Sequence, residues 1–489
     1  MSGFGIVLLA AVAALVPLTG LPAFLVVLCA AVVGAVVGIA GGSIPPNLLV
    51  ALPSRLVNLL ENDLLQALPL YVLVGALMNQ LRVADSMFSA TVRVLRGSRP
   101  APAVAGLTLG ALLGPMSGSV GASVVALSRA VAPRLAAGGM AAPARHALVA
   151  VASTLGVVVP PSLVLILLAD GMLNAHYVAV HVTHRTERIV NTQDVFRGAM
   201  VPAALFLLLC LGVAAWESRR AGAPSRSSAT ELARADALIA LAALALIVGL
   251  LFGVATGRFL PVEGAAAGAF VLFMVALAGG RLGGGVLGSV LVDVMATTGA
   301  LFSLLVAATS FTLVFRALGS DKLLEAWITT APLSPTLLTV LVLVVIGLSA
   351  VALDAFEIIF VMVPILIPPL LMRVPDASWV AVLVLLALQT SYLLPPMGYA
   401  LVMTRGVLGG NVSARATARH VAPYVVAQLL VLGSVLAFPA LVHLGQPAES
   451  RAAADGAAMS DEEVGRRLQE MLAPPPEVDD SSAGTAAVK

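Results

Sequence analysis

The sequence predicts an all-α polytopic membrane protein made of two inverted repeats, each with a re-entrant hairpin and a broken transmembrane helix. Of the 489 residues, 60% are hydrophobic and 11% are charged, whereas an average soluble domain has about 25% charged residues. Apolar runs long enough to cross a bilayer core of about 30 Å recur along the chain. Prolines and polar residues interrupt two other apolar stretches in each half. These observations place the chain in a lipid bilayer.

The uninterrupted apolar runs are the predicted spans. They cover residues 4–19, 21–41, 66–81, 199–216, 236–253, 262–279, 289–315 and 421–443. The first run lacks a positively charged leader and a second run follows at once, so we expect a retained segment and not a cleaved signal peptide. Cys29 and Cys210 lie inside apolar stretches, which implies no disulfide framework.

The interrupted stretches form two pairs in the same order. Residues 101–135 and 336–372 are predicted re-entrant hairpins, and residues 143–172 and 378–403 are predicted spanning helices broken at their middles. Unpaired backbone groups cannot face lipid, so such breaks occur only where protein or a water-filled site satisfies them.

The two halves match when the chain is shifted so that Pro160 falls on Pro395. The same shift places Ser119 on Asp354, so the hairpin tip and the helix break keep their spacing. Equivalent spans lie an odd number of crossings apart, which predicts that the halves are inverted. Inverted repeats with paired discontinuous helices are a recurrent plan of secondary transporters, with the substrate site at the breaks.

The chain therefore divides into five parts. They are N-terminal membrane segments that serve as scaffold (1–65), a first repeat (66–216), a linker with two scaffold helices (217–288), a second repeat (289–443) and a disordered tail (444–489). The tail is rich in Ala, Pro and acidic residues, and we assign it no chemistry.

The distribution of basic residues orients this arrangement. With loop 82–100 on the inside, the inside loops carry 15 Lys and Arg, the outside loops carry 8 and the tail carries 4. Short cytoplasmic loops hold the excess of basic residues, so this orientation is favoured. It puts both termini outside, which makes the tail periplasmic in a bacterium.

The first break and the first hairpin tip supply candidate ligands. The break combines Ser153 and Thr154 with Pro160 and Pro161. Its hydroxyls and freed carbonyls suit a hard cation such as sodium, and amides at a half-helix N-terminus suit a carboxylate. The alternative is a proline kink needed only for packing.

The tip of the first hairpin reads Ser117-Gly118-Ser119. Such small residues let the backbone approach an ion, or alternatively let two helices pack closely.

The second hairpin carries Asp354 and Glu357, three residues apart. Ionisable groups inside apolar segments are costly and usually face a cavity or a partner, so the pair could bind sodium or a proton. The alternative is a structural ion pair, for example with Arg316. We favour a functional role for Asp354, because it maps onto Ser119, and leave both roles open for Glu357.

The second break is the most informative stretch. It combines the polar side chains of Gln389, Thr390 and Ser391 with the break at Pro395 and Pro396.

Other polar residues are expected to be surface groups. Asp170 should lie solvated at the outer end of its helix, and His176, His181 and His184 should lie solvated in an exterior loop. No Walker, nucleophile-elbow or zinc-protease motif occurs, and no basic cluster suggests nucleic acid. We therefore expect no enzyme and no nucleic-acid partner.

Two segments carry a family resemblance. Residues 160–170, which begin Pro-Pro-Ser, and residues 389–400, with Pro-Pro-Met-Gly, resemble the large permease subunit of tripartite ATP-independent periplasmic (TRAP) transporters. The second segment is most similar to the branch for mannitol or chloroaromatic compounds. The resemblance runs from about residue 5 to residue 440.

The resemblance implies an elevator mechanism driven by an inward sodium gradient in the bacterial inner membrane. A periplasmic binding protein would deliver a small organic acid, and a small membrane subunit would brace the scaffold. Nothing in segment 1–65 could encode that subunit's four helices, so we expect it to be a separate chain. Sodium would be the coupling ion, with no other cofactor.

In this family the hairpin tips and helix breaks form the sodium and substrate sites. The positions carried over are Ser117, Gly118, Ser119, Ser153, Thr154, Asp354, Gln389, Thr390 and Ser391. The first tip departs from the Thr-Gly expected there, which leaves its ion ligands open. Two rival functions remain: a stand-alone sodium- or proton-coupled carrier of similar fold, and a membrane scaffold or channel without coupled transport.

Overall fold

The computed structural model describes residues 2–445 except 82, 97, 117–118, 161, 221–233, 352, 396–397 and 411. Within this part of the chain every regular element is helical. Eight of the described helices are long and apolar enough to cross a membrane, or nine if the bent pair Leu65–Met78 and Val83–Val94 counts as one span. This confirms the predicted all-α polytopic fold. The predicted tail lies outside the described residues.

Helices of the first half precede the undescribed segment 221–233. They are α1 (Ser2–Thr19), α2 (Ala23–Ala40), α3 (Leu52–Leu60), α4 (Asp63–Gln80), α5 (Val83–Val94), α6 (Ala101–Leu113), α7 (Val120–Ala130), α8 (Ala132–Ala137), α9 (Ala142–Val158), α10 (Leu163–Thr183) and α11 (Thr192–Arg220). A 3-10 turn, η2 (Gly114–Met116), continues α6.

Helices of the second half follow that segment. They are α12 (Arg234–Ala255), α13 (Pro261–Ala278), α14 (Val286–Ala317), α15 (Ser320–Thr330), α16 (Pro335–Ser349), α17 (Ala355–Glu357), the π-helical η3 (Ile358–Met362), α18 (Val363–Arg373), α19 (Ala377–Leu393), α20 (Tyr399–Leu408), α21 (Ala414–Ala437) and α22 (Ala440–His443). The run expected as one span over 421–443 thus ends at Ala437. Pro439 lies two residues later, at the N-cap of α22.

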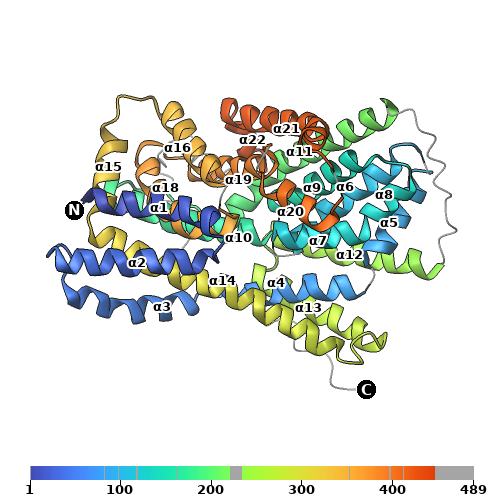
Figure 1. The fold of residues 1–489 in the computed structure, drawn as a ribbon, viewed down its shortest axis with the longest axis horizontal. Coiled ribbons are helices and arrows are strands. Elements are labelled where there is room, and N and C mark those ends of the chain that lie inside the picture. Colours follow the sequence, from blue (N-terminus) through green and yellow to red (C-terminus); the bar gives the residue numbers. More distant parts are fainter. Residues whose placement is uncertain are drawn as a thin grey trace, which may run out of the picture. The chain divides into compact units, whose positions relative to one another are not determined.

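The shift that matches Pro160 with Pro395 reappears in the helix boundaries. Helices α9 and α19 both have 17 residues, and the shift places the first residue of α9, Ala142, on the first residue of α19, Ala377. The contacts between helices also come in pairs that the shift relates. Helix α2 packs on α14 as α13 packs on α4, and α7 packs on α20 as α18 packs on α10 (Figure 1). The shift also pairs α2, which lies in segment 1–65, with α13.

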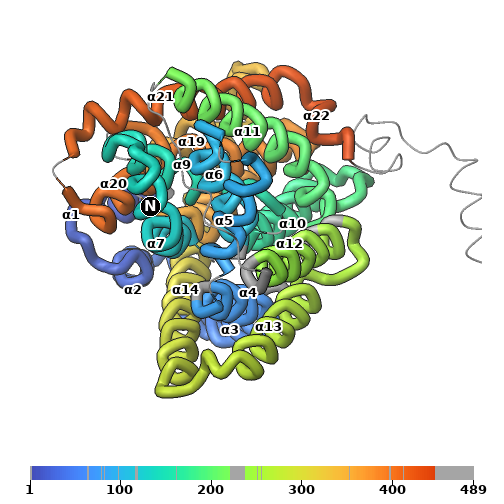
Figure 2. The backbone as a smooth tube through the Cα atoms, turned by 90° about the vertical axis from the view of Figure 1, so that its right-hand side faces the viewer, coloured from blue at the N-terminus to red at the C-terminus, as the bar shows by residue number. Residues whose placement is uncertain are grey.

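Helices α9 and α19 form the interior of the described part. All 17 residues of α19 are buried, as is α9 from His146 to Val158, and both lie in the middle of the helices in Figure 2. Helices that are apolar on every side are buried in this way. By contrast, α2 and α14 expose large apolar side chains such as Val36 and Met295, as expected of faces that contact lipid.

Paired glycines bring α6 and α9 into close contact. A Cβ atom at Gly156 would overlap backbone atoms of Gly114, and one at Gly110 would overlap the backbone of Ala152. The two backbones can approach this closely only because the side chains are absent. This contact sets the position of the first hairpin against the first broken helix.

Replacing Gly156 by Ala should therefore destabilise the protein. Overpacking of this kind costs about 1–3 kcal/mol, which should lower the midpoint of thermal unfolding in detergent. Gly212→Ala is the matched control, because no atom lies within 4 Å of a Cβ atom built there. Equal midpoints for the two variants would contradict the close contact.

Candidate functional site

The first break, between α9 and α10, is joined by one hydroxyl group. The Ser162 Oγ donates to the carbonyl of Val157 at 2.8 Å and accepts from the amide of Leu165 at 3.0 Å. Ser162 therefore satisfies one backbone group on each side of the break and caps α10. Pro160 is buried beside it.

The second break, between α19 and α20, is closed by backbone alone. The amide of Gly398 donates to the carbonyl of Leu394 at 2.8 Å. A Cβ atom at Gly398 would lie 2.5 Å from the carbonyl oxygen of Tyr392, so only glycine fits. Pro395 is half-buried in this turn.

Four predicted hydroxyl-bearing residues line the breaks, and all four are buried. Each donates to a carbonyl three or four residues earlier in its own helix, at 2.7–2.9 Å: Ser153, Thr154, Thr390 and Ser391. With their protons engaged in this way, the oxygens keep lone pairs for a donor or a cation.

A glutamine connects the two broken helices. The Gln389 Nε2 donates to the carbonyl of Thr154 at 3.3 Å, across a sequence separation of 235 residues. Thr154 and Gln389 are thus equivalent residues of the two halves in direct contact. The Gln428 Nε2 of α21 donates to the Gln389 Oε1 at 3.1 Å. Both glutamine side chains are fully buried.

The tip of the second hairpin is organised by its two acidic residues. The Ala355 amide donates to Asp354 Oδ1 at 2.8 Å, and the Asp354 amide donates to Glu357 Oε2 at 2.8 Å. Glu357 therefore caps the helix that begins at the tip. The ion pair with Arg316 considered above is not among those formed by the described residues.

Two tyrosines lie between the hairpins. The Tyr392 hydroxyl is fully buried beside the Asp354 carboxyl, yet it forms no hydrogen bond of acceptable geometry with any described residue. Its ring lies 6.0 Å from that of Tyr399. The Tyr399 hydroxyl in turn lies 3.1 Å from the position of a Cβ atom at Gly121, in the second arm of the first hairpin.

A cavity of about 560 Å³ reaches Ser119 at the first hairpin tip. It lies between α7 and the helices α4, α5 and α14, and its polar lining includes Asp85, Arg129 and Asp293. The predicted site residues Ser117, Gly118, Pro161 and Pro396 lie outside the described residues.

Two expectations of solvated side chains are wrong. Asp170 is half-buried and accepts from the Asn62 Nδ2 at 3.2 Å, because α4 packs against α10. His176 is buried, and its Nδ1 accepts from the Val190 amide at 3.1 Å. Among the described residues, no group of three or more His, Cys, Asp or Glu side chains could hold a metal ion.

The sequence did not single out Tyr392 or Gln428. Tyr392 lies three residues after Gln389, within the polar segment already recognised, and Gln428 is an isolated amide in the apolar stretch 425–433 of α21. A polar residue inside a span is a signal of a buried partner, and that signal could have identified Gln428.

Comparisons with known proteins identify the family of this chain. The family model for "Tripartite ATP-independent periplasmic transporter, DctM component" matches residues 6–441. The chain is 26% identical over 399 residues to the C4-dicarboxylate TRAP transporter large permease protein DctM of Pseudomonas aeruginosa, covering 81% of this chain and 89% of that protein. It is 23% identical to the sialic acid TRAP transporter permease protein SiaT of Haemophilus influenzae, covering 81% of this chain and 62% of SiaT.

A solved structure shares the fold. The crystal structure of the YdaH transporter of Alcanivorax borkumensis superimposes with a TM-score of 0.58 at 16% identity, covering 81% of this chain and 89% of that chain.

Replacing Gln389 by Leu tests the connection between the broken helices. The change removes the contact with Thr154 and leaves the buried amide of Gln428 with one partner fewer. Losing a buried hydrogen bond costs about 1–3 kcal/mol, so the midpoint of thermal unfolding in detergent should fall by several degrees. The exposed Gln66 offers the control Gln66→Leu. If the two variants unfold at the same temperature, Gln389 does not hold the helices together.

Proposed function

The chain belongs to the family of the DctM component of tripartite ATP-independent periplasmic transporters, and on that premise we propose that it carries out sodium-coupled uptake of an organic carboxylate. It is a transport protein and not an enzyme. In this proposal it works in the bacterial inner membrane with a small membrane subunit and a periplasmic binding protein that delivers the solute. The tail after residue 444 is then periplasmic.

One observation supports this function above the others: two broken helices meet at equivalent residues, Thr154 and Gln389. Beside this contact lie buried hydroxyl oxygens, and the Asp354 carboxyl lies by Tyr392, three residues after Gln389 in the sequence; such oxygen ligands suit a hard cation. Inverted repeats that place discontinuous helices at the midplane allow alternating access around a fixed site. We therefore propose an elevator movement of the hairpins and broken helices against the remaining spans.

The class of solute follows from the named relatives and from the chemistry of a helix break. Two relatives are named for C4-dicarboxylates and for sialic acid, both of which are acids. Amide groups at the start of a half-helix favour a carboxylate. The cavity that reaches Ser119 is also lined by Ala84 and Asp85 of α5. The orientation expected from the basic residues puts segment 82–100 inside, so we infer that the described state is open toward the inside.

The rival carrier and channel functions predict different uptake results in a reconstituted system. Proteoliposomes that contain this chain, the small subunit and solute-loaded binding protein should take up solute only under an inward sodium gradient. Uptake without the binding protein would favour a stand-alone carrier. Solute flux that ignores the sodium gradient would favour a channel.

Asp354→Asn should weaken sodium dependence more than it lowers protein abundance. The amide keeps the shape of the side chain and removes the charge that attracts a cation. We expect the sodium concentration for half-maximal uptake to rise about tenfold, the equivalent of about 1.4 kcal/mol. Glu61→Gln, at an exposed acidic residue, controls for the loss of one charge. A variant that fails to insert or fold would make Asp354 a structural residue.

Tyr392→Phe separates ion binding from packing. The ring is kept, and the hydroxyl that is lost forms no hydrogen bond of acceptable geometry with a described residue, so thermal stability should change little. If that hydroxyl completes the Asp354 site, the sodium concentration for half-maximal uptake should rise. A fall of several degrees in the unfolding midpoint with unchanged sodium dependence would show that Tyr392 only supports the fold.

A further inference from the structure

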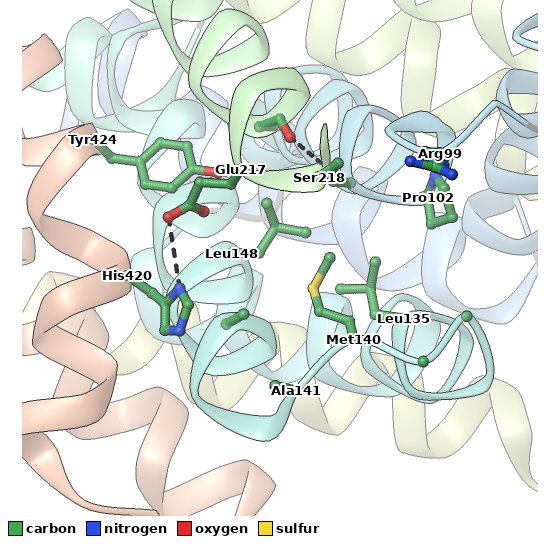
Figure 3. A pocket seen from close by; sticks show the side chains of 15 residues that line it. Arg99, Pro102, Leu135, Met140, Ala141, Leu148, Glu217, Ser218, His420 and Tyr424 are labelled. Carbon is green, nitrogen blue, oxygen red and sulfur yellow. Dashed lines mark hydrogen bonds and ion pairs between the residues drawn. The ribbon is translucent and has the colours of Figure 1, made fainter. Parts of the chain in front are cut away.

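A second cavity lies away from the helix breaks, beside Arg99 in the connection between α5 and α6. It has a volume of about 240 Å³. Figure 3 shows its side chains, which come from the start of α6, the segment joining α8 to α9, the end of α11 and the first turns of α21. The lining also includes Leu135 of α8 and Leu148 of α9, and these helices pack on one another, so the cavity is a gap within a helix cluster.

This cavity exists where the first half has small residues. The equivalent positions of the second half carry large side chains. The shift that relates the two halves places Ala144 on Trp379 and Gly138 on Arg373. Trp379 is buried, and its Nε1 donates to the carbonyl of Val435 at 2.8 Å. The Arg373 guanidinium donates to four backbone carbonyl groups. Large side chains can therefore occupy these positions of the fold, and Ala144 and Gly138 leave the corresponding space empty of side chains.

Charged groups lie at the two ends of the cavity. Arg99 is exposed at one end and forms no ion pair or hydrogen bond with any described residue. At the other end the His420 Nδ1 lies 3.5 Å from the Glu217 Oε1. The Tyr424 side chain is 1% exposed, and in Figure 3 its hydroxyl points toward Glu217. That hydroxyl has no hydrogen-bond partner within the described part of the chain.

Apolar side chains separate these two ends. Leu135, Met140 and Leu148 lie between Arg99 and the Glu217–His420 pair in Figure 3. A ligand that fits has an apolar body, a negative group for the guanidinium and a hydrogen-bonding group for the opposite end. Pockets for drug-sized ligands measure about 300–1,000 Å³, so this cavity suits a smaller molecule.

We propose that this cavity is a binding site for a small carboxylic acid that carries an apolar body and a distal hydroxyl group. The carboxylate binds Arg99, because guanidinium groups form strong charge-assisted hydrogen bonds with carboxylates. The hydroxyl binds at Glu217 and Tyr424, whose polar groups line that end of the cavity. The site is separate from the helix breaks and requires neither sodium nor a binding protein.

The test is calorimetric titration of the purified protein in sodium-free detergent solution with 4-hydroxyphenylacetate. Two related probes separate the contacts: tyrosol has an alcohol in place of the carboxylate, and phenylacetate lacks the ring hydroxyl. We expect saturable binding of 4-hydroxyphenylacetate, and binding weaker by about tenfold for tyrosol, since hydrogen bonds to charged groups contribute about 1.5–3 kcal/mol. Phenylacetate should bind more weakly by a smaller factor.

Variants locate the site. Ala144→Trp installs the side chain found at the equivalent position 379 and should abolish binding. Arg99→Gln should weaken binding about tenfold, whereas Arg93→Gln, at an exposed arginine outside the cavity, should leave it unchanged. If Ala144→Trp does not fold, the two arginine variants decide the question.

Two results would overturn the proposal. One is unchanged affinity in both Ala144→Trp and Arg99→Gln. The other is equal affinity for all three probes, which would indicate an apolar gap that accepts any ring or acyl chain. Because the titration contains no sodium and no binding protein, its failure would leave the proposed transport function untouched, and failure of sodium-driven uptake would leave this site untouched.

Discussion

Hydrogen bonding of backbone groups inside a membrane is the constraint on which the rest of this structure depends. A helix that breaks at membrane depth leaves amide and carbonyl groups that lipid cannot satisfy. The first break meets this demand with the Ser162 hydroxyl, and the second meets it with a turn in which only a residue without a Cβ atom fits at position 398. Both breaks must then lie inside protein, which explains why α9 and α19 are buried and why the other helices surround them.

Departures from the repeat mark the places where the two halves differ in chemistry. The first hairpin has Ser119 where the second has Asp354, and Val157 occupies the position equivalent to Tyr392. The acidic residue and its tyrosine therefore belong to the second half alone, and they face each other there. The Ala144 and Trp379 pair is a third departure: Ala144 lines the cavity near Arg99, whereas Trp379 fills the equivalent position with a large buried side chain.

The sequence predicted the fold class well, because apolar runs and proline breaks are local signals. It also predicted that Gln389, Thr390 and Ser391 lie together, since they are consecutive residues in one broken helix. What it could not provide were contacts between distant segments. The buried His176 ring accepts a hydrogen bond from the amide of Val190, and the Gln389 side chain donates to Thr154 in the other half of the chain. Such contacts depend on tertiary packing, which no short window of sequence contains.

The central claim is that the two halves are inverted across the membrane, with their breaks meeting between them. Single cysteines at Ser98 and Pro332, both exposed before α6 and α16, test it directly once Cys29 and Cys210 are replaced. A membrane-impermeant maleimide should label Ser98→Cys only in inverted vesicles and Pro332→Cys only in spheroplasts. Labelling of both positions from the same face would contradict the inverted arrangement.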